Sequence, residues 1–300
     1  MSISPQQPDT RPAPAPAPQS PKARFRFKKP ALFYSPVGLV GALICLFWTL
    51  TSIFAPLLAP YSPTAQMDAF QPPGTTTADG MYFLLGTDHL GRDVLSRIIW
   101  GGRRVLFYAT IATGSAYIVG VSAGLIAGYF RGWVDDVLSS IANVVLSFPI
   151  LVLYVVIIST FGSSGINIVL AITFASAPGI MRIVRAIVFD LRNREYVTSA
   201  QTRGEGSMFI MFVEILPNTT SLLLVDACLR LGYTTITIGV LGFLGLGLPP
   251  PQPDWGSMVN EARSMALFAP YMTIFPCLAI SSLVLGLNLL ADGLRESSNP

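Results

Sequence analysis

Six apolar runs, each of about 20 residues or more, constrain this chain more than any other feature. They cover residues 37–58, 105–129, 136–160, 166–188, 219–247 and 268–291. About 20 apolar residues in a helix are enough to cross the hydrocarbon core of a bilayer. Of the 300 residues, 52% are hydrophobic and only 12% are charged, as expected for a chain that lies mostly in lipid. We therefore predict an all-α polytopic membrane protein with six transmembrane helices, and an even number of spans puts both termini on one side.

The N-terminal segment, residues 1–32, has a different composition. It is rich in Pro, Ala, Gln and Ser and then becomes basic, so it has little to bury and much to solvate. We predict a disordered cytoplasmic tail, because a basic cluster next to the first apolar run places the N-terminus inside. A cleaved signal peptide is the weaker alternative, since the apolar run is long and starts late. The basic residues are Lys22, Arg24, Arg26, Lys28 and Lys29.

This orientation assigns each connecting segment to a side of the membrane. Residues 59–104, 161–165 and 248–267 fall outside, and residues 130–135 and 189–218 fall inside. The region over 182–203, at the inner side, carries five arginines, as the positive-inside rule requires: Arg182, Arg185, Arg192, Arg194 and Arg203. The outer region carries four that oppose it: Arg92, Arg97, Arg103 and Arg104. We therefore predict that both termini lie in the cytoplasm, although the four outer arginines conflict with this orientation.

Several kinds of chemistry are excluded by what the chain lacks. All lysines lie in the tail, so no Gly-rich loop ends in Gly-Lys-Ser/Thr and no P-loop is present. His89 is the only histidine, which removes His-clustered metal sites. Cys45, Cys228 and Cys277 all lie in apolar runs and give no sign of a disulfide framework. We predict no catalysis by this chain and no bound metal or cofactor.

Glycines and prolines predict how the spans pack and bend. Gly120, Gly124 and Gly128 recur every four residues, which puts them on one helix face and allows a neighbouring helix to approach closely. Prolines in the apolar runs remove backbone donors, so we expect kinks or discontinuous helices there. These prolines are Pro149, Pro178, Pro270 and Pro276.

Asp226 and Arg230 are the only ionisable pair within the apolar runs, and they stand one helical turn apart. Charges this deep in a membrane are costly and usually face a protein interior or a water-filled cavity. They are therefore candidates for lining a translocation path. A structural ion pair with a neighbouring helix is an equally favoured alternative.

A short polar segment, EYVTSAQTRGEGSMFIMFVEILPN, interrupts the apolar runs between Glu195 and Asn218. We predict a helix over Glu195 to Arg203, a sharp turn at Gly204 and Gly206, and a second helix over Ser207 to Leu216 that Pro217 ends. Met208, Phe209, Met211 and Phe212 are too apolar for an ordinary exposed loop. Either a partner protein covers them, or the second helix lies on the lipid surface.

This segment resembles the cytoplasmic loop of the inner-membrane permeases of ATP-binding-cassette (ABC) importers. That loop carries an EAA pattern, three residues, Gly, nine to ten residues and then Leu-Pro. Here Thr198-Ser199-Ala200 is followed by three residues, Gly204 and then Leu216-Pro217-Asn218. Thr198 stands where the family has Glu, and Ser199 where it has Ala. The resemblance implies that the loop inserts into a cytoplasmic ATPase and transmits its closure, through Glu195, Tyr196, Thr198, Ser199, Ala200, Gly204, Leu216 and Pro217.

Two further stretches narrow the resemblance to the C-type permease of the dipeptide, oligopeptide and nickel branch. They are GTDHLGRDVLSRIIWGG (Gly86 to Gly102) and FLGLGLPPPQPDWG (Phe243 to Gly256). In them we expect Trp100 and Trp255 to be interfacial belt residues, or the stretches to form a periplasmic docking surface. The likeness covers roughly residues 33–295. It implies the type I importer (MetI-like) permease fold in a multi-pass protein of the bacterial inner membrane.

The resemblance also implies an assembly. Its members are a second homologous permease, two cytoplasmic ATPases that use ATP and Mg²⁺, and a periplasmic solute-binding protein, with no nucleic acid involved. In this chain we expect a first span plus periplasmic segment over 33–102, and a core permease domain over 103–294 with the coupling loop at 195–218.

We therefore expect one half of a channel that imports di- or oligopeptides, or else nickel chelates or oligosaccharides, by alternating access. An ion-coupled secondary transporter that uses Asp226 and a membrane scaffold without transport are the weaker alternatives.

Overall fold

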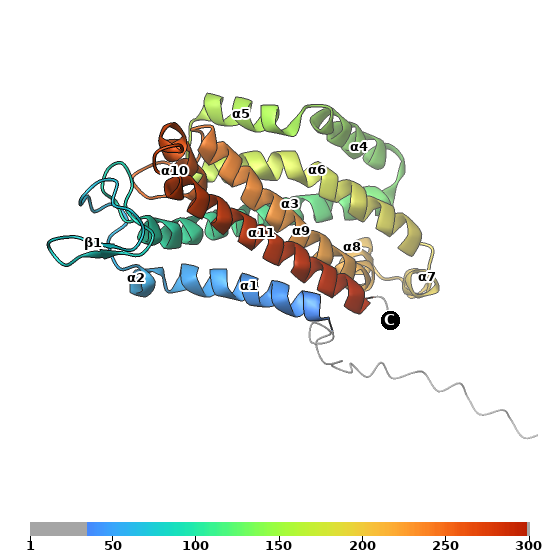
Figure 1. Ribbon diagram of the computed structural model, residues 1–300. Helices are drawn as coiled ribbons and strands as arrows, with labels where there is room; N and C mark the ends of the chain where they lie inside the picture. The colour runs from blue at the N-terminus through green and yellow to red at the C-terminus, as the bar shows by residue number, and fades with distance from the viewer. Residues whose placement is uncertain (1–34, 299–300) are drawn as a thin grey trace, which may run out of the picture. The chain divides into compact units, whose positions relative to one another are not determined.

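The computed structural model describes residues 35–298, so the predicted tail over 1–32 lies outside the described residues. The long helices are α1 (Pro36–Ile53), α3 (Val94–Phe130), α4 (Gly132–Leu146), α5 (Ile150–Phe161), α6 (Gly165–Leu191), α9 (Leu216–Phe243) and α11 (Tyr271–Ser298) (Figure 1). The short elements are α2 (Ala55–Leu58), α7 (Glu195–Thr202), α8 (Ser207–Phe209), the π-helical turn η2 (Ile210–Ile215), α10 (Trp255–Ala262), the 3₁₀ turn η3 (Arg263–Met265), and the antiparallel strands β1 (Thr75–Thr76) and β2 (Tyr82–Phe83).

The predicted all-α architecture with six spans is confirmed. Among the described residues, five helices are long and apolar enough to cross a membrane, and α4 with α5, bent by 86°, is the sixth when this pair is counted as one span. The second span begins well before residue 105, because α3 starts at Val94. Asp93 caps this start, since its side chain accepts a hydrogen bond from the Ser96 N–H at 2.7 Å.

The glycine stripe of α3 is where α6 packs. A Cβ atom added at Gly124 would lie 2.6 Å from Cβ of Val184, and one at Gly128 would lie 2.7 Å from Cβ of Val188. Only glycine permits this approach, as the four-residue spacing predicted. The α3–α6 contact is the central seam of the bundle. A second close approach, not predicted, joins α1 to α11, where a Cβ at Gly38 would lie 2.8 Å from Cα of Gly293.

The discontinuity that the prolines predict is present at one of them. Pro149 stands at the break between α4 and α5, so this span is discontinuous. Pro178 and Pro276 lie inside α6 and α11, which continue through them, and Pro270 directly precedes α11. Neighbouring helices allow a membrane helix to tolerate an interior proline.

The prediction that Pro217 ends a helix is wrong. The chain stays helical from Ser207 through α8, η2 and α9 to Phe243, and Pro217 sits in the first turn of α9. The π-helical turn explains this. The Leu216 N–H bonds to the Met211 carbonyl five residues back, so the backbone is widened where the proline ring would otherwise meet it.

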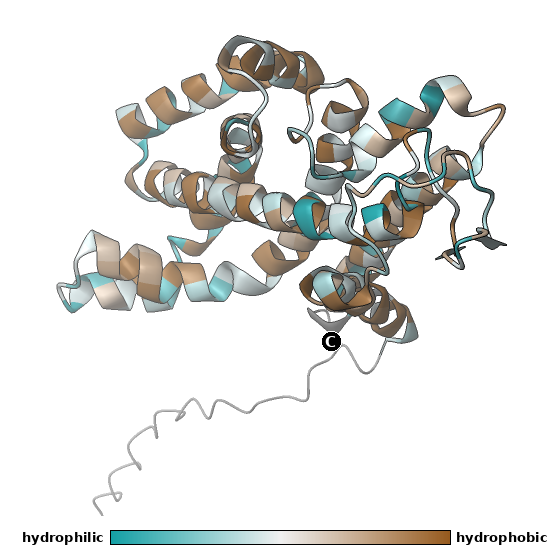
Figure 2. Ribbon diagram, turned by 90° about the vertical axis from the view of Figure 1, so that its left-hand side faces the viewer, coloured by the Kyte–Doolittle hydropathy of each residue, from teal (hydrophilic) through white to brown (hydrophobic). Residues whose placement is uncertain are grey.

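The helices of residues 35–298 run between two ends that carry different elements. One end, here called the α10 end, holds β1, β2 and α10, and the other, called the α7 end, holds α7, α8 and the start of α1 (Figure 1). Apolar residues dominate the helices, and hydrophilic residues gather in the connecting segments (Figure 2). The two ends therefore carry most of the polar surface.

Candidate functional site

The segment predicted to couple to an ATPase begins with α7, a helix of 8 residues. Its inner face consists of Val197 and Ala200, which are both fully buried against residues of α3, α6 and η2. Gly204 has a positive φ of 82°, and this lets the chain turn sharply into α8. The helix and turn lie where the sequence predicted them.

The residues named for coupling divide by exposure. Glu195, Thr198, Ser199, Gly204 and Pro217 are exposed, Tyr196 and Leu216 are half-buried, and Ala200 is buried. Ala200 therefore anchors the helix from within, whereas Thr198 and Ser199 present its outer face. Burial raises the pKa of the Tyr196 phenol above its ordinary value.

Beside α7, the helix that starts at Ser207 shows apolar side chains on its outer face. Met208 is 65% exposed, while Phe209 and Phe212 are 41% and 44% exposed. Met211, which was expected among them, is fully buried in the same cluster as Val197. An apolar surface beside polar α7 is typical of a contact that another molecule completes.

Asp226 and Arg230 form an ion pair in α9, with Nε of Arg230 2.6 Å from Oδ2 of Asp226. The hydroxyl of Tyr117 in α3 donates a hydrogen bond to the same oxygen. At 1.5 Å per residue, Arg230 lies about 21 Å along α9 from Leu216, near its middle. The structure thus brings the two predicted residues together and adds Tyr117, whose role no local sequence pattern indicates.

The two charges of this pair face different hollows. Arg230 lines a cavity of about 350 Å³ between α3, α5, α6 and α9. Asp226 lines another of about 530 Å³ on the side of α11, with Asp292 and Arg295. The first cavity is rich in hydroxyl groups, contributed by Thr113, Tyr154, Ser176, Tyr233, Thr234 and Thr237.

The α10 end contains a charged cluster that the sequence analysis did not identify. Asp88, Arg92, Arg97 and Glu261 form one network, called here the Asp88–Glu261 network. Nη2 of Arg92 lies 2.5 Å and Nη1 of Arg97 lies 2.9 Å from Oε2 of Glu261, and both arginines also bind Asp88. The stretch GTDHLGRD contains Asp88 and Arg92, which could have indicated a charged cluster. Glu261, which completes the network, is far away in the sequence.

The arginines set the protonation of both carboxyls. Burial alone would raise the pKa of Asp88, but Arg97 and Arg92, with backbone N–H donors, hold it below its usual value. For Glu261 the effect of burial is likewise outweighed by Arg97 and Arg92, so its pKa is lowered. Atoms of Asp88, His89 and Glu261 also lie within 4.8 Å of one another. A divalent cation there would face two guanidinium charges, so the geometry favours ion pairing over metal binding.

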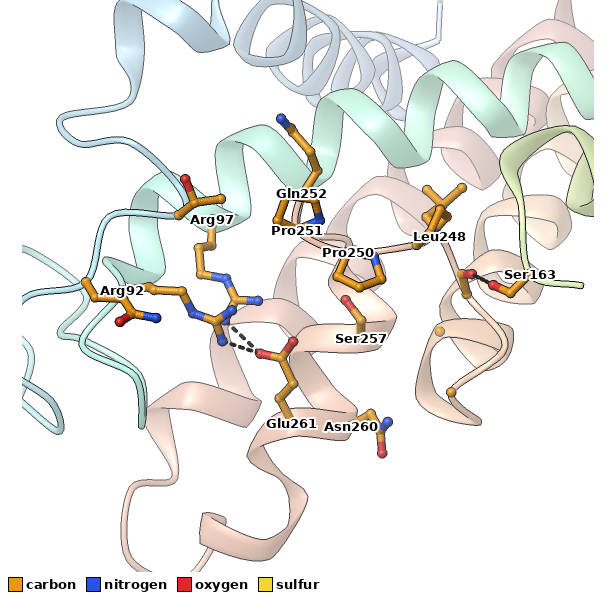
Figure 3. A pocket seen from close by; sticks show the side chains of 16 residues that line it. Arg92, Arg97, Ser163, Leu248, Pro250, Pro251, Gln252, Ser257, Asn260 and Glu261 are labelled. Carbon is orange, nitrogen blue, oxygen red and sulfur yellow. Dashed lines mark hydrogen bonds and ion pairs between the residues drawn. The ribbon is translucent and has the colours of Figure 1, made fainter.

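The network borders a cavity of about 530 Å³ (Figure 3). Arg92, Arg97 and Glu261 meet on one side, and the proline-rich loop over 248–252 lies opposite them (Figure 3). Arg104 of α3 fixes this loop by donating hydrogen bonds to the carbonyls of Pro249 and Gln252. Three of the four arginines that opposed the predicted orientation therefore have partners within the fold, and the fourth, Arg103, stacks on Trp100.

Trp255 is a core residue, so its prediction as an interfacial belt residue is wrong. It is fully buried, its ring N–H donates a 2.9 Å hydrogen bond to the Ile98 carbonyl, and its ring meets that of Trp48 edge-on at 4.8 Å. Asp254 just before it is also fully buried and caps α10. Burial raises the pKa of Asp254 above the usual value, against the lowering effect of its Ser257 donors.

Comparison with known proteins places the chain in a family. The family model described as the binding-protein-dependent transport system inner membrane component matches residues 120–300. A second, the N-terminal TM domain of oligopeptide transport permease C, matches residues 23–73. The chain belongs to this permease family.

Among similar permeases is the dipeptide transport system permease protein DppC of Haemophilus influenzae, 38% identical over 265 residues, or 88% of this chain and 90% of that protein. The glutathione transport system permease protein GsiD of Pectobacterium atrosepticum is 41% identical over 216 residues, 72% of each chain. The di/tripeptide transport system permease protein DppC of Pseudomonas aeruginosa is 38% identical over 88% of each chain. The protein is therefore a multi-pass inner-membrane permease subunit of the binding-protein-dependent type, as the sequence indicated.

Proposed function

We propose that this permease forms one half of the translocation channel of an ATP-driven importer of di- and oligopeptides. The single observation that carries the proposal is the unbroken helix from Ser207 to Phe243. It joins the exposed apolar surface at Met208 and Phe209 to the hydroxyl-lined cavity at Arg230. A movement imposed at the α7 end is in this way carried to the middle of the bundle.

The partner at the α7 end is a cytoplasmic ATPase. Thr198 and Ser199 lie on the exposed face of α7, and Phe209 and Phe212 lie exposed on the next helix, so together they offer a mixed polar and apolar contact. ATP and Mg²⁺ are used by two such ATPases, and this chain binds neither. Coupling two states of a channel requires several kcal/mol of differential binding, which ATP supplies.

Membership of the permease family supports the rest of the assembly that we propose. A second, homologous permease completes the channel, and an extracytoplasmic solute-binding protein delivers the peptide to the α10 end. Both termini then lie in the cytoplasm. The partners found for the outer arginines support this orientation, because Arg92 and Arg97 are neutralised by Asp88 and Glu261.

Peptides are the favoured cargo because relatives named as dipeptide, di/tripeptide and glutathione permeases match most of the chain. Asp226 and Arg230 are proposed to line the path, since charges this deep in a membrane face protein interiors or water-filled cavities. No observation favours nickel chelates, oligosaccharides or an ion-driven mechanism.

The test is transport by the complete complex in proteoliposomes with ATP inside or outside. We expect labelled dipeptide to accumulate only with ATP on the ATPase side. Thr198→Cys is expected to crosslink to the ATPase subunit, whereas the control Thr64→Cys at the α10 end is not. Uptake by this permease without any ATPase, or a Thr198→Cys crosslink that never forms, contradicts the proposal.

A further inference from the structure

We infer that Arg230 is the receptor for a substrate carboxylate, and that the cavity it lines passes peptides in their carboxylate-bearing form. This inference rests on the proposed function, because it assigns a substrate group to the proposed path. It goes beyond that function by separating the roles of the two charges in the pair.

The guanidinium of Arg230 bonds to Asp226 through its Nε and also lines the cavity. Its Nε donates to Asp226, which fixes the plane of the group. Its Nη1 and Nη2 atoms lie beside Gly179 of α6, where an added Cβ would be 3.5 and 3.7 Å from them. Arg230 and Gly179 both line the 350 Å³ cavity, so the guanidinium borders the space that a solute would enter. Such a planar pair of donors matches the two oxygens of a carboxylate.

Asp226 is not an equivalent receptor for the opposite charge. Its Oδ2 already accepts hydrogen bonds from Nε of Arg230 and from the Tyr117 hydroxyl. These two donors stabilise its negative charge, and it borders the other hollow, on the side of α11. In the cavity lined by Arg230, the charge offered to a solute is therefore positive.

The other walls of the cavity suit a small polar solute. Tyr154, Ser176 and Thr237 supply hydroxyl groups from α5, α6 and α9, and these can donate to a carboxylate or accept from a peptide N–H. Leu146 and Ile150, on either side of the α4–α5 bend, also line it. A change in that bend would alter the cavity, which is what release of a bound carboxylate requires.

The experiment compares a short peptide with its C-terminal amide. Transport of each is measured with the complete complex in proteoliposomes, and the affinity of the solute-binding protein for each is measured separately. We expect the wild-type complex to favour the free acid by about tenfold to a hundredfold beyond the preference of the binding protein, since charged hydrogen bonds of this kind carry that discrimination.

Arg230→Gln is expected to remove this extra preference, and Arg230→Lys, which keeps the charge without the planar fork, to retain part of it. The double variant Asp226→Asn with Arg230→Gln leaves no unpaired charge, so it tests the same point if the single variant assembles poorly. Arg182→Gln, an exposed arginine that bonds Asn143, is the matched control and should keep the full preference.

An amidated peptide that carries a glutamate side chain tests whether Arg230 binds a terminal or a side-chain carboxylate. If this peptide is transported as well as the free acid, the inference extends to any carboxylate. An extra preference that survives Arg230→Gln in an assembled complex overturns the inference. So does a wild-type complex with no preference beyond that of its binding protein. Absence of ATP-driven uptake of either peptide is a different result, because it contradicts the proposed function itself.

Discussion

At the α10 end, two carboxylates and two guanidiniums close on one another between segments as far as 169 residues apart, and Trp255 and Asp254 beside them are fully buried. At the α7 end, α7 is held through the small buried side chains of Val197 and Ala200, and Met208 remains 65% exposed. The first end pairs the charges of Asp88, Arg92, Arg97 and Glu261 within the chain. The second end leaves a surface that a partner must complete, so it can move farther with that partner than the first end, which we call the fixed end because its charges pair within the chain.

The largest expected effect tests the fixed end. Arg97→Gln removes the guanidinium that contacts both Asp88 and Glu261 and leaves Asp88 buried with less compensation. Breaking one partner of a buried ion pair costs about 3–5 kcal/mol of unfolding free energy. Thermal unfolding of the purified complex measures it, with Arg103→Gln, an exposed arginine stacked on Trp100, as control. Equal midpoints for the two variants would show that the network does not hold this end.

The next effect tests the seam that joins the two ends. Gly124→Val forces a side chain into the space that Val184 occupies, and overpacking of this kind costs about 1–3 kcal/mol. Gly114→Ala is the matched control on the same helix, because nothing lies within 4 Å of its added Cβ. We expect Gly124→Val to have a lower unfolding temperature and to yield less complex than Gly114→Ala. Alanine favours a helix more than glycine does, so equal damage from Gly114→Ala would show that the packing against Val184 is not what Gly124→Val disturbs.

A smaller effect is expected at the α7 end. Val197→Ala removes two methyl groups from the buried face of α7, worth about 1.5 kcal/mol of local burial. Because α7 is anchored mainly by this face, we expect ATP-driven transport to fall more than the unfolding temperature does. Ser199→Ala, at an exposed position, should not alter the unfolding temperature. If transport and unfolding temperature fall to the same extent in Val197→Ala, the α7 end is not specialised for coupling, and the contrast between the two ends is wrong.

The smallest effect is the pH dependence of the fixed end. The pKa values of Asp88 and Glu261 lie below their ordinary values of 3.8 and 4.5 in the folded protein. Their contribution to stability is therefore complete above about pH 5 and is lost as the pH falls through the lowered folded values. Unfolding temperatures measured from pH 7 to about pH 2 should decline less steeply below about pH 5 in Arg97→Gln than in the wild type. An identical decline would place the acid sensitivity elsewhere.

Much of this architecture could be predicted from local patterns in the sequence. The spans follow from apolar length, the α3–α6 seam from the spacing of Gly120, Gly124 and Gly128, and α7 from its polar composition and Gly204. The pairing of Asp226 with Arg230 also follows from their spacing of one turn. Each of these features depends on residues close together in the chain.

The features that were missed depend on distant partners. Nothing near Asp88 indicates Glu261, nothing near Asp226 indicates Tyr117, and the burial of Trp255 depends on Trp48 and Ile98. Pro217 misled because its rule describes a regular α-helix, and the π-helical turn before it relaxes the steric conflict.

The helix from Ser207 to Phe243 has a mechanical consequence. If it behaves as a stiff rod that pivots at Arg230, its Ser207 end lies about 35 Å and its Phe243 end about 20 Å from the fulcrum. A rotation of 5° would then displace the first by about 3 Å and the second by about 1.7 Å in opposite directions, with almost no translation at Arg230. Arg230, at the pivot, would stay in contact with a bound peptide while the openings at both ends of the channel change width.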